Sequence, residues 1–156
     1  MTADDLRLAV IDMEKQIFYE KTNFESLTGD SGLNFTSTGR YDKIYEHIHA
    51  HKYYQNLNSG GDVSFSDSLV SWYREIYNPI VKIINKKKIA NHFPGKSGAD
   101  LYIWIVRHWD FTKKKQGDNY SIEDAAKNFS ARYGLPKKNI FGFIASVLSG
   151  MRNAER

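Results

Sequence analysis

The stretch that most constrains the fold is residues 68–105, where aromatic side chains are interspersed with residues that interrupt helices. Its first part has an apolar face at helical spacing, made by Trp72, Tyr73, Ile76 and Tyr77. Pro79 interrupts this pattern, because proline has no amide hydrogen and disfavours helical geometry at the preceding residue. Apolar residues resume at 80–84, a turn follows at 92–95, and a nearly all-apolar helix spans about residues 98–114. The pattern predicts three helices separated by a proline break and a tight loop.

Helical signals also dominate the rest of the chain. Leu6, Val10, Met13 and Ile17 form one apolar stripe of a helix that starts at Asp4-Asp5 and ends near residue 22. Residues 23–38 read as a loop, after which Ser37 or Thr38 caps a helix over 39–56. Capping-box patterns begin further helices at Ser64 and Ser121, and the apolar spacing over 136–149 predicts a last one. The expected fold is all-α, a single compact bundle of about five to seven helices with a C-terminal helical hairpin.

A polar, charged linker over residues 113–119 suggests how the chain is divided. Residues 1–115 would form a helical core domain. Residues 116–156 would form a helix-turn-helix-like hairpin that is packed on this core or appended to it.

The amino-acid composition excludes several classes of function. The chain has no cysteine, which excludes disulfides and cysteine-based catalysis or zinc binding. It has no apolar run long enough to cross a membrane, and its start is acidic where a signal peptide is basic, so we expect a cytoplasmic protein. Charge is uneven: residues 1–60 hold 6 basic and 9 acidic side chains, whereas residues 61–156 hold 16 basic and 9 acidic ones. The basic part favours a polyanionic partner.

Nucleic acid is one such partner, and the C-terminal hairpin is the candidate region. Lys137, Lys138 and Asn139 would open its second helix, where a helix-turn-helix makes base and phosphate contacts. Two lysine runs offer further phosphate contacts, at Lys86, Lys87 and Lys88 and at Lys113 and Lys114. The alternative is that the hairpin only packs or self-associates and that the lysine runs are solvated helix ends.

A second group of residues is expected to form a buried polar and aromatic cluster. Buried aromatic side chains with polar tips need hydrogen-bond partners, and histidine and aspartate can supply them. The candidates are His47, His51, Trp72, Tyr73, Tyr77, Asp100, Trp104 and His108. A metal-dependent hydrolase built on the three histidines and Asp100 is an alternative. Zinc-protease, P-loop and nucleophile-elbow motifs are absent, so we assign no catalytic residue, metal or cofactor.

Part of the chain resembles the helical region that follows the ParB-like domain in bacterial ParB-like transcriptional regulators. The resemblance covers roughly residues 10–110, and the residues that carry it are Phe18–Thr22, Tyr41–His47, His51–Tyr54, Ser71–Tyr73, Tyr77–Val81, Phe93–Lys96 and Ala99–Trp104. The chain departs from the family at Lys96-Ser97-Gly98, where an Arg-Thr-Glu-like stretch is expected. The phosphate loop of the ParB-like domain is also missing from the chain, so no activity of that domain is carried over. The resemblance implies a non-enzymatic module of such a regulator. Its possible partners are DNA, a second copy or a ParB-like domain, and a protein-interaction module without nucleic-acid binding is the alternative.

Overall fold

The N-terminal half of the molecule is built from α1 (Ala3–Thr22), α2 (Phe24–Thr28), α3 (Arg40–Ser59) and α4 (Phe65–Trp72). In the computed structural model, which describes residues 1–135, α1 starts at Ala3, one residue before Asp4. Thr2 is its N-cap, and Thr2 and Asp5 exchange hydrogen bonds as a capping box. The Asp5 carboxylate accepts from the Thr2 N–H and the Thr2 hydroxyl accepts from the Asp5 N–H, so two amide groups at the helix start have partners.

The segment between α1 and α3 differs from the expected loop. Phe24–Thr28 forms the short helix α2, which buries Phe24 completely. The start of α3 is not capped by Ser37 or Thr38. Its N-cap is Gly39, whose φ of 77° lies in the left-handed region that glycine adopts without steric cost.

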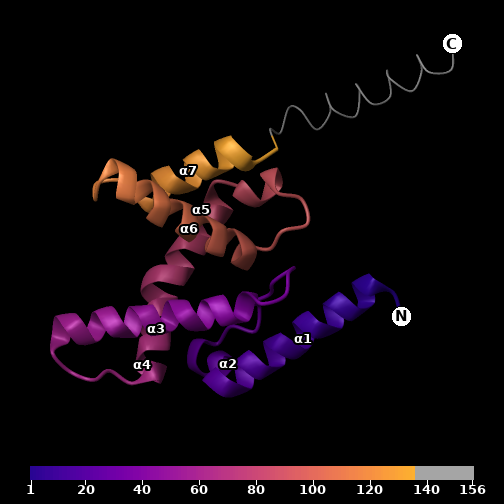
Figure 1. Ribbon diagram of the computed structural model, residues 1–156, viewed down its shortest axis with the longest axis horizontal. Helices are drawn as coiled ribbons and strands as arrows, with labels where there is room; N and C mark the ends of the chain where they lie inside the picture. The colour runs from indigo at the N-terminus through magenta and orange to yellow at the C-terminus, as the bar shows by residue number, and fades with distance from the viewer. Residues whose placement is uncertain (136–156) are drawn as a thin grey trace, which may run out of the picture.

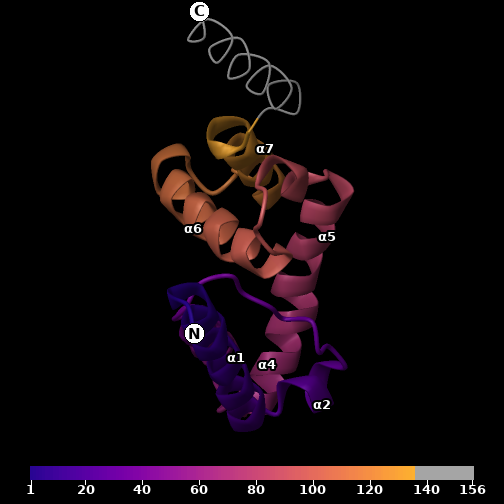
Figure 2. The same ribbon diagram turned by 90° about the vertical axis from the view of Figure 1, so that its right-hand side faces the viewer.

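The proline break is a widened helical turn. Between α4 and α5 (Asn78–Lys86) lies a π-helical turn, η1 (Tyr73–Tyr77), in which the Asn78 N–H donates to the carbonyl of Tyr73 five residues earlier. In a regular α-helix the ring of Pro79 would clash with the carbonyl four residues earlier, and the widened turn avoids this. The three elements consequently form one continuous column along the length of the molecule (Figure 2).

The C-terminal half adds the 3₁₀ turn η2 (Ile89–His92), α6 (Gly98–Gln116) and α7 (Ile122–Tyr133). The predicted helix over 98–114 is confirmed, and Ser97 caps it in a capping box with Asp100. Ser64 and Ser121 cap α4 and α7, as their sequence patterns predict. These local signals fold as expected because each satisfies amide groups that the helix itself leaves unpaired.

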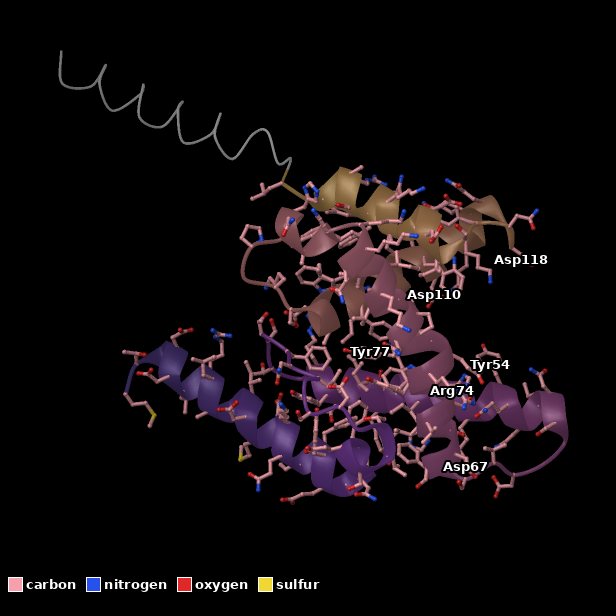
Figure 3. The ribbon with its side chains drawn as sticks, turned by 180° about the vertical axis from the view of Figure 1, so that it is seen from behind. Tyr54, Asp67, Arg74, Tyr77, Asp110 and Asp118 are labelled. Carbon is pink, nitrogen blue, oxygen red and sulfur yellow. The ribbon has the colours of Figure 1, made fainter. Side chains whose placement is uncertain are left out.

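The helices are arranged in two layers joined by the column (Figure 1). One layer holds α1 to α4 and the other α5 to α7, and α6 packs against α5 and α7. Three fully or nearly buried aromatic residues, Trp72, Tyr77 and Tyr102, lie where the layers meet, with ring centroids 4.9–5.9 Å apart; Figure 3 labels Tyr77 at this level. The predicted all-α class is confirmed for residues 1–135.

The C-terminal hairpin is described only in its first arm. α7 packs on α6 and buries Ala125, Ala126 and Phe129 in the common core. The second arm, over 136–149, lies outside the described residues. The predicted boundary after residue 115 falls in the last turn of α6. None of the helices in the described part of the chain has the length and apolarity needed to cross a bilayer.

The apolar stripe predicted on α1 is exposed. Leu6, Met13 and Ile17 are 56%, 55% and 56% exposed, whereas the residues that face the core are Ile11, Phe18 and Thr22. Within residues 1–135, α1 therefore presents an uncovered apolar face.

Candidate functional site

A buried chain of three polar aromatic side chains joins the two layers. Trp72 on α4 donates its Nε1–H to the Tyr102 hydroxyl on α6 (3.1 Å), and that hydroxyl also lies 3.0 Å from Nδ1 of His47 on α3. Trp72 and Tyr102 are each 1% exposed. Burial lowers the pKa of His47 from its usual value and raises the pKa of Tyr102, so both side chains are held neutral.

His51 belongs to a separate network between α3 and α4. Its Nε2 lies 2.8 Å from the Ser71 hydroxyl, which also accepts from Gln55 Nε2 (3.0 Å). Gln55 in turn accepts from the buried Ser68 hydroxyl (2.8 Å). Burial lowers the pKa of His51 as well. This network satisfies the polar groups buried between the two helices, which is a structural role.

Asp100 ties the start of α6 to the segment before α3. Its carboxylate accepts from the backbone N–H of Thr36 (3.1 Å), from the Thr36 hydroxyl (2.7 Å) and from the backbone N–H of Ser97 (2.9 Å). Tyr73 makes a similar connection by donating to Asp30 (2.8 Å), and its pKa is raised to about 12, chiefly by burial. Both side chains hold separate segments together.

The remaining members of the predicted cluster lie on the far side of α6. His108 lies 2.9 Å from Asn128 of α7, and Trp104 lies against Phe129. The predicted cluster is thus divided: His47, Trp72 and Tyr77 come together, whereas His51, Asp100 and His108 each have other partners. In residues 1–135, no three His, Asp or Glu side chains are placed to hold a metal ion.

A cleft of about 500 Å³ opens between α3 and α6, and His47 is part of its lining. Its ionisable lining comes from side chains at helical spacing on the two helices, namely Arg40, Lys43, Glu46 and His47 on α3 and Arg107, Asp110 and Lys114 on α6. Apolar atoms come from Ile103, Val106 and Phe111. Asp110 is labelled in Figure 3. The cleft carries four basic and two acidic side chains.

The opposite side of α6 carries an apolar groove. One hollow of about 450 Å³ is lined mainly by His92, Phe93, Pro94, Trp104, Phe129 and Leu135. A second, of about 250 Å³, shares Trp104, Phe129 and Tyr133 with the first and continues along α6 to Arg107, His108 and Phe111. Arg107 and Phe111 line the cleft as well. Tyr133 and Leu135 are more than half exposed.

The predicted basic residues lie at helix ends. Lys86 is in the last turn of α5, Lys87 is its C-cap and Lys88 follows, whereas Lys113 and Lys114 are in the last turn of α6. Lys113 is also 3.9 Å from Asp118. Lys137, Lys138 and Asn139 lie outside the described residues.

One contact brings the end of the described chain to the first lysine run. The backbone N–H of Leu135 donates to the carbonyl of His92 (2.8 Å), and His92 Nδ1–H donates back to the carbonyl of Leu135 (2.7 Å). Gly134 fits here only because it has no side chain, since an added Cβ would lie 2.8 Å from His92 Cβ. The end of α7 is therefore held against η2, four residues after Lys88.

Sequence reasoning missed the cleft and the partners of several predicted polar residues. Arg40, Lys43, Arg107 and Lys114 recur at helical intervals, a signal that places each pair on one helix face but leaves the facing of the two helices unknown. The partners Thr36, Ser71 and Gln55 had no sequence signal, because they are distant in the chain from the groups that they satisfy.

No protein-family model matches the chain, and comparisons with the curated proteins and with the solved structures give no match.

Proposed function

We propose that this protein is a non-enzymatic, cytoplasmic helical module of a ParB-like regulator that associates with nucleic acid through a basic surface at η2. The observation that carries the proposal is the pair of hydrogen bonds between Leu135 and His92. These bonds hold Leu135, the last described residue, next to η2 and the Lys86–Lys88 run, and Lys137 follows Leu135 by two positions in the sequence. Lys88 and Lys137 are 49 residues apart in the sequence, and the proposal is that both contact the same nucleic acid.

Lys88 supports this proposal by its conformation. Its φ is 52°, which places a long side chain in the left-handed region where glycine or asparagine is the usual residue. The lysine therefore costs stability at a position that ends α5. A cation exposed at a helix C-terminus is favoured by the helix dipole, and it is also free to meet a phosphate.

The test is binding of a labelled random-sequence duplex, followed by fluorescence anisotropy at about 50 and about 200 mM salt. We expect binding that weakens with salt. Each lost phosphate contact reduces the slope of log affinity against log salt by about 0.9, so Lys86→Gln/Lys88→Gln and Lys137→Gln/Lys138→Gln should each reduce it by up to about 2.

The matched control is Lys21→Gln/Lys52→Gln, which removes the same charge from the acidic N-terminal half. This variant should bind as the wild type does. An equal loss in the control would mean that only net charge matters, and absence of duplex binding at the lower salt concentration would refute the proposal.

Self-association is a second candidate, favoured by the exposed apolar face of α1. Leu6, Val10, Met13 and Ile17 are spaced four, three and four residues apart, as in the seam of a coiled coil. Three of them are more than half exposed, so a second copy would cover a face that residues 1–135 leave open.

Sedimentation equilibrium tests this candidate. The wild type should show a dimer that dissociates on dilution, and Met13→Glu should be monomeric because it buries an unpaired charge in the seam. Gln16→Glu, a polar exposed position of the same helix, is the control and should leave the dimer intact. A wild-type chain that remains monomeric at the highest concentrations would exclude this route.

A further inference from the structure

We propose that the cleft between α3 and α6 binds a small organic phosphate of about the size of a mononucleotide. The inference is independent of the nucleic-acid proposal, since it uses neither the Lys86–Lys88 run nor Lys137 and Lys138. It rests on a hydrogen-bond relay that fixes a donor at the wall of the cleft, on the unpaired cations around it, and on the mixed chemistry of the remaining lining.

The relay sets the proton positions. The indole N–H of Trp72 can only donate, so the Tyr102 oxygen accepts from it. Among residues 1–135, Nδ1 of His47 is the one other group within hydrogen-bonding distance of this hydroxyl. The Tyr102 proton must therefore point at Nδ1, which makes Nδ1 an acceptor. A neutral His47 then carries its proton on Nε2, on the opposite edge of the ring, and His47 lines the cleft.

The cations of the cleft are available to a ligand. Lys43 is paired with Glu46 (3.1 Å), but Arg40, Arg107 and Lys114 form no ion pair within residues 1–135. Arg107 and Lys114 stand on one face of α6, seven residues apart, opposite Arg40 on α3. Arginine matches the geometry of a phosphate with two parallel N–H groups, so the cleft provides charged donors beside the neutral N–H of His47.

The other lining residues indicate an organic phosphate rather than a free anion. Glu46 and Asp110 are acceptors that would repel a second anionic group but suit the hydroxyl groups of a sugar. Ile103, Val106 and Phe111 offer an apolar wall. Lys115 Nζ lies over the Phe111 ring, 4.4 Å from its centroid, so a base would pack against the part of this exposed ring that Lys115 leaves open. A volume of about 500 Å³ is in the range of small-molecule sites.

Titration of the full chain with adenosine monophosphate, followed by calorimetry and by amide chemical shifts in NMR spectra, tests the proposal. Inorganic phosphate and adenosine are the comparison ligands. We expect the nucleotide to bind more tightly than either comparison ligand, with the largest shifts in α3 and α6. Arg107→Gln, an exposed substitution, should weaken nucleotide binding roughly 10- to 100-fold, the loss expected for one charge-assisted contact. Arg132→Gln on α7 is the matched control and should bind normally.

The imidazole nitrogen shifts of His47 provide a second readout. They should report the Nε2–H tautomer, and the Nδ1–H tautomer would overturn the relay. Equal affinity for adenosine and the nucleotide, or binding that Arg107→Gln leaves unchanged, would overturn the phosphate assignment. Equal affinity for inorganic phosphate and the nucleotide would show that the sugar and base add nothing to binding, and would overturn the assignment of an organic phosphate.

The two proposals fail separately. Arg107→Gln should keep duplex binding, whereas Lys86→Gln/Lys88→Gln should keep nucleotide binding. If the cleft variant loses duplex binding and the nucleotide does not bind, the cleft is part of the nucleic-acid surface and the small-ligand proposal is wrong.

Discussion

The two hollows on either side of α6 have nearly the same volume and opposite chemistry. The α3–α6 cleft measures about 500 Å³ and the larger part of the α6–α7 groove about 450 Å³. The cleft is lined by charged side chains and backed by a buried hydrogen-bond relay. The groove is lined by aromatic rings, and its neighbours Phe93 and Phe129 are stacked with ring centroids 5.2 Å apart.

The difference comes from the helix that faces α6 on each side. α3 presents Arg40, Lys43 and His47 to it, whereas α7 presents Ala125, Ala126 and Phe129. Two hollows of similar size on one helix therefore offer a ligand different chemistry, because a different helix completes each of them. Tyr102 and Trp72 fix His47 of the cleft through buried and half-buried contacts. By contrast, His92 and His108 of the groove are held by Leu135 and Asn128 through exposed contacts.

The largest difference between the two hollows should appear when one tyrosine hydroxyl is removed from each, in separate variants. Tyr102→Phe deletes the centre of the relay and leaves the Trp72 N–H and His47 Nδ1 without a partner. We expect the free energy of unfolding to fall by about 1–3 kcal/mol, the cost of unsatisfied buried polar groups. Urea denaturation measures it.

Tyr133→Phe is the matched control in the groove. Its hydroxyl has no hydrogen bond within residues 1–135 and its side chain is 55% exposed, so the change should stay within about 0.5 kcal/mol. If the two variants lose equal stability, the Tyr102 hydroxyl has no special role and the contrast between the two hollows is lost.

A smaller decrease in the free energy of unfolding is expected when the pH is lowered. Burial lowers the pKa values of His47 and His51 below the usual 6.5, so the unfolded chain binds more protons than the folded one below that pH. The stability from these neutral histidines is complete above pH 6.5. It should be lost as the pH falls from 6.5 through the folded-state pKa values.

Urea denaturation at several pH values between 7.5 and 5 tests this prediction. His47→Gln should show a shallower loss of stability with acid than the wild type, since it removes one of the two groups. His49→Gln, at an exposed position of the same helix, should retain the wild-type slope. A stability that does not change over this range, or equal slopes in all three proteins, would contradict it.

Local signals account for the part of the fold that was predictable. Ser64, Ser97 and Ser121 cap helices because each side chain satisfies an amide group three residues away, and such a contact depends on the sequence alone. The expected helix over 98–114 matches α6 for the same reason. The helix α2 and the Gly39 start of α3 were not predicted. For α2 the reason is that the Phe24 ring is buried among residues distant in the sequence, and this packing stabilises the short helix.

The candidate sites divide in the same way. The lysine runs and the polar aromatic residues could be identified in the sequence, but their grouping could not. His47, His51, Asp100 and His108 look like one set in the sequence, yet each has a different partner, because the two layers present different faces of α3 and α6 to one another.

By itself, the sequence determined the helical class, most helix boundaries and the excess of positive charge after residue 60, because these depend on residues within a turn or two of each other. Only the tertiary structure decided that Tyr102 connects His47 to Trp72, that Arg40 faces Arg107 across a cleft, and that Leu135 is held against His92. These contacts join residues 30 to 67 positions apart. Their formation depends on how the helices pack, which spacing along one helix does not specify.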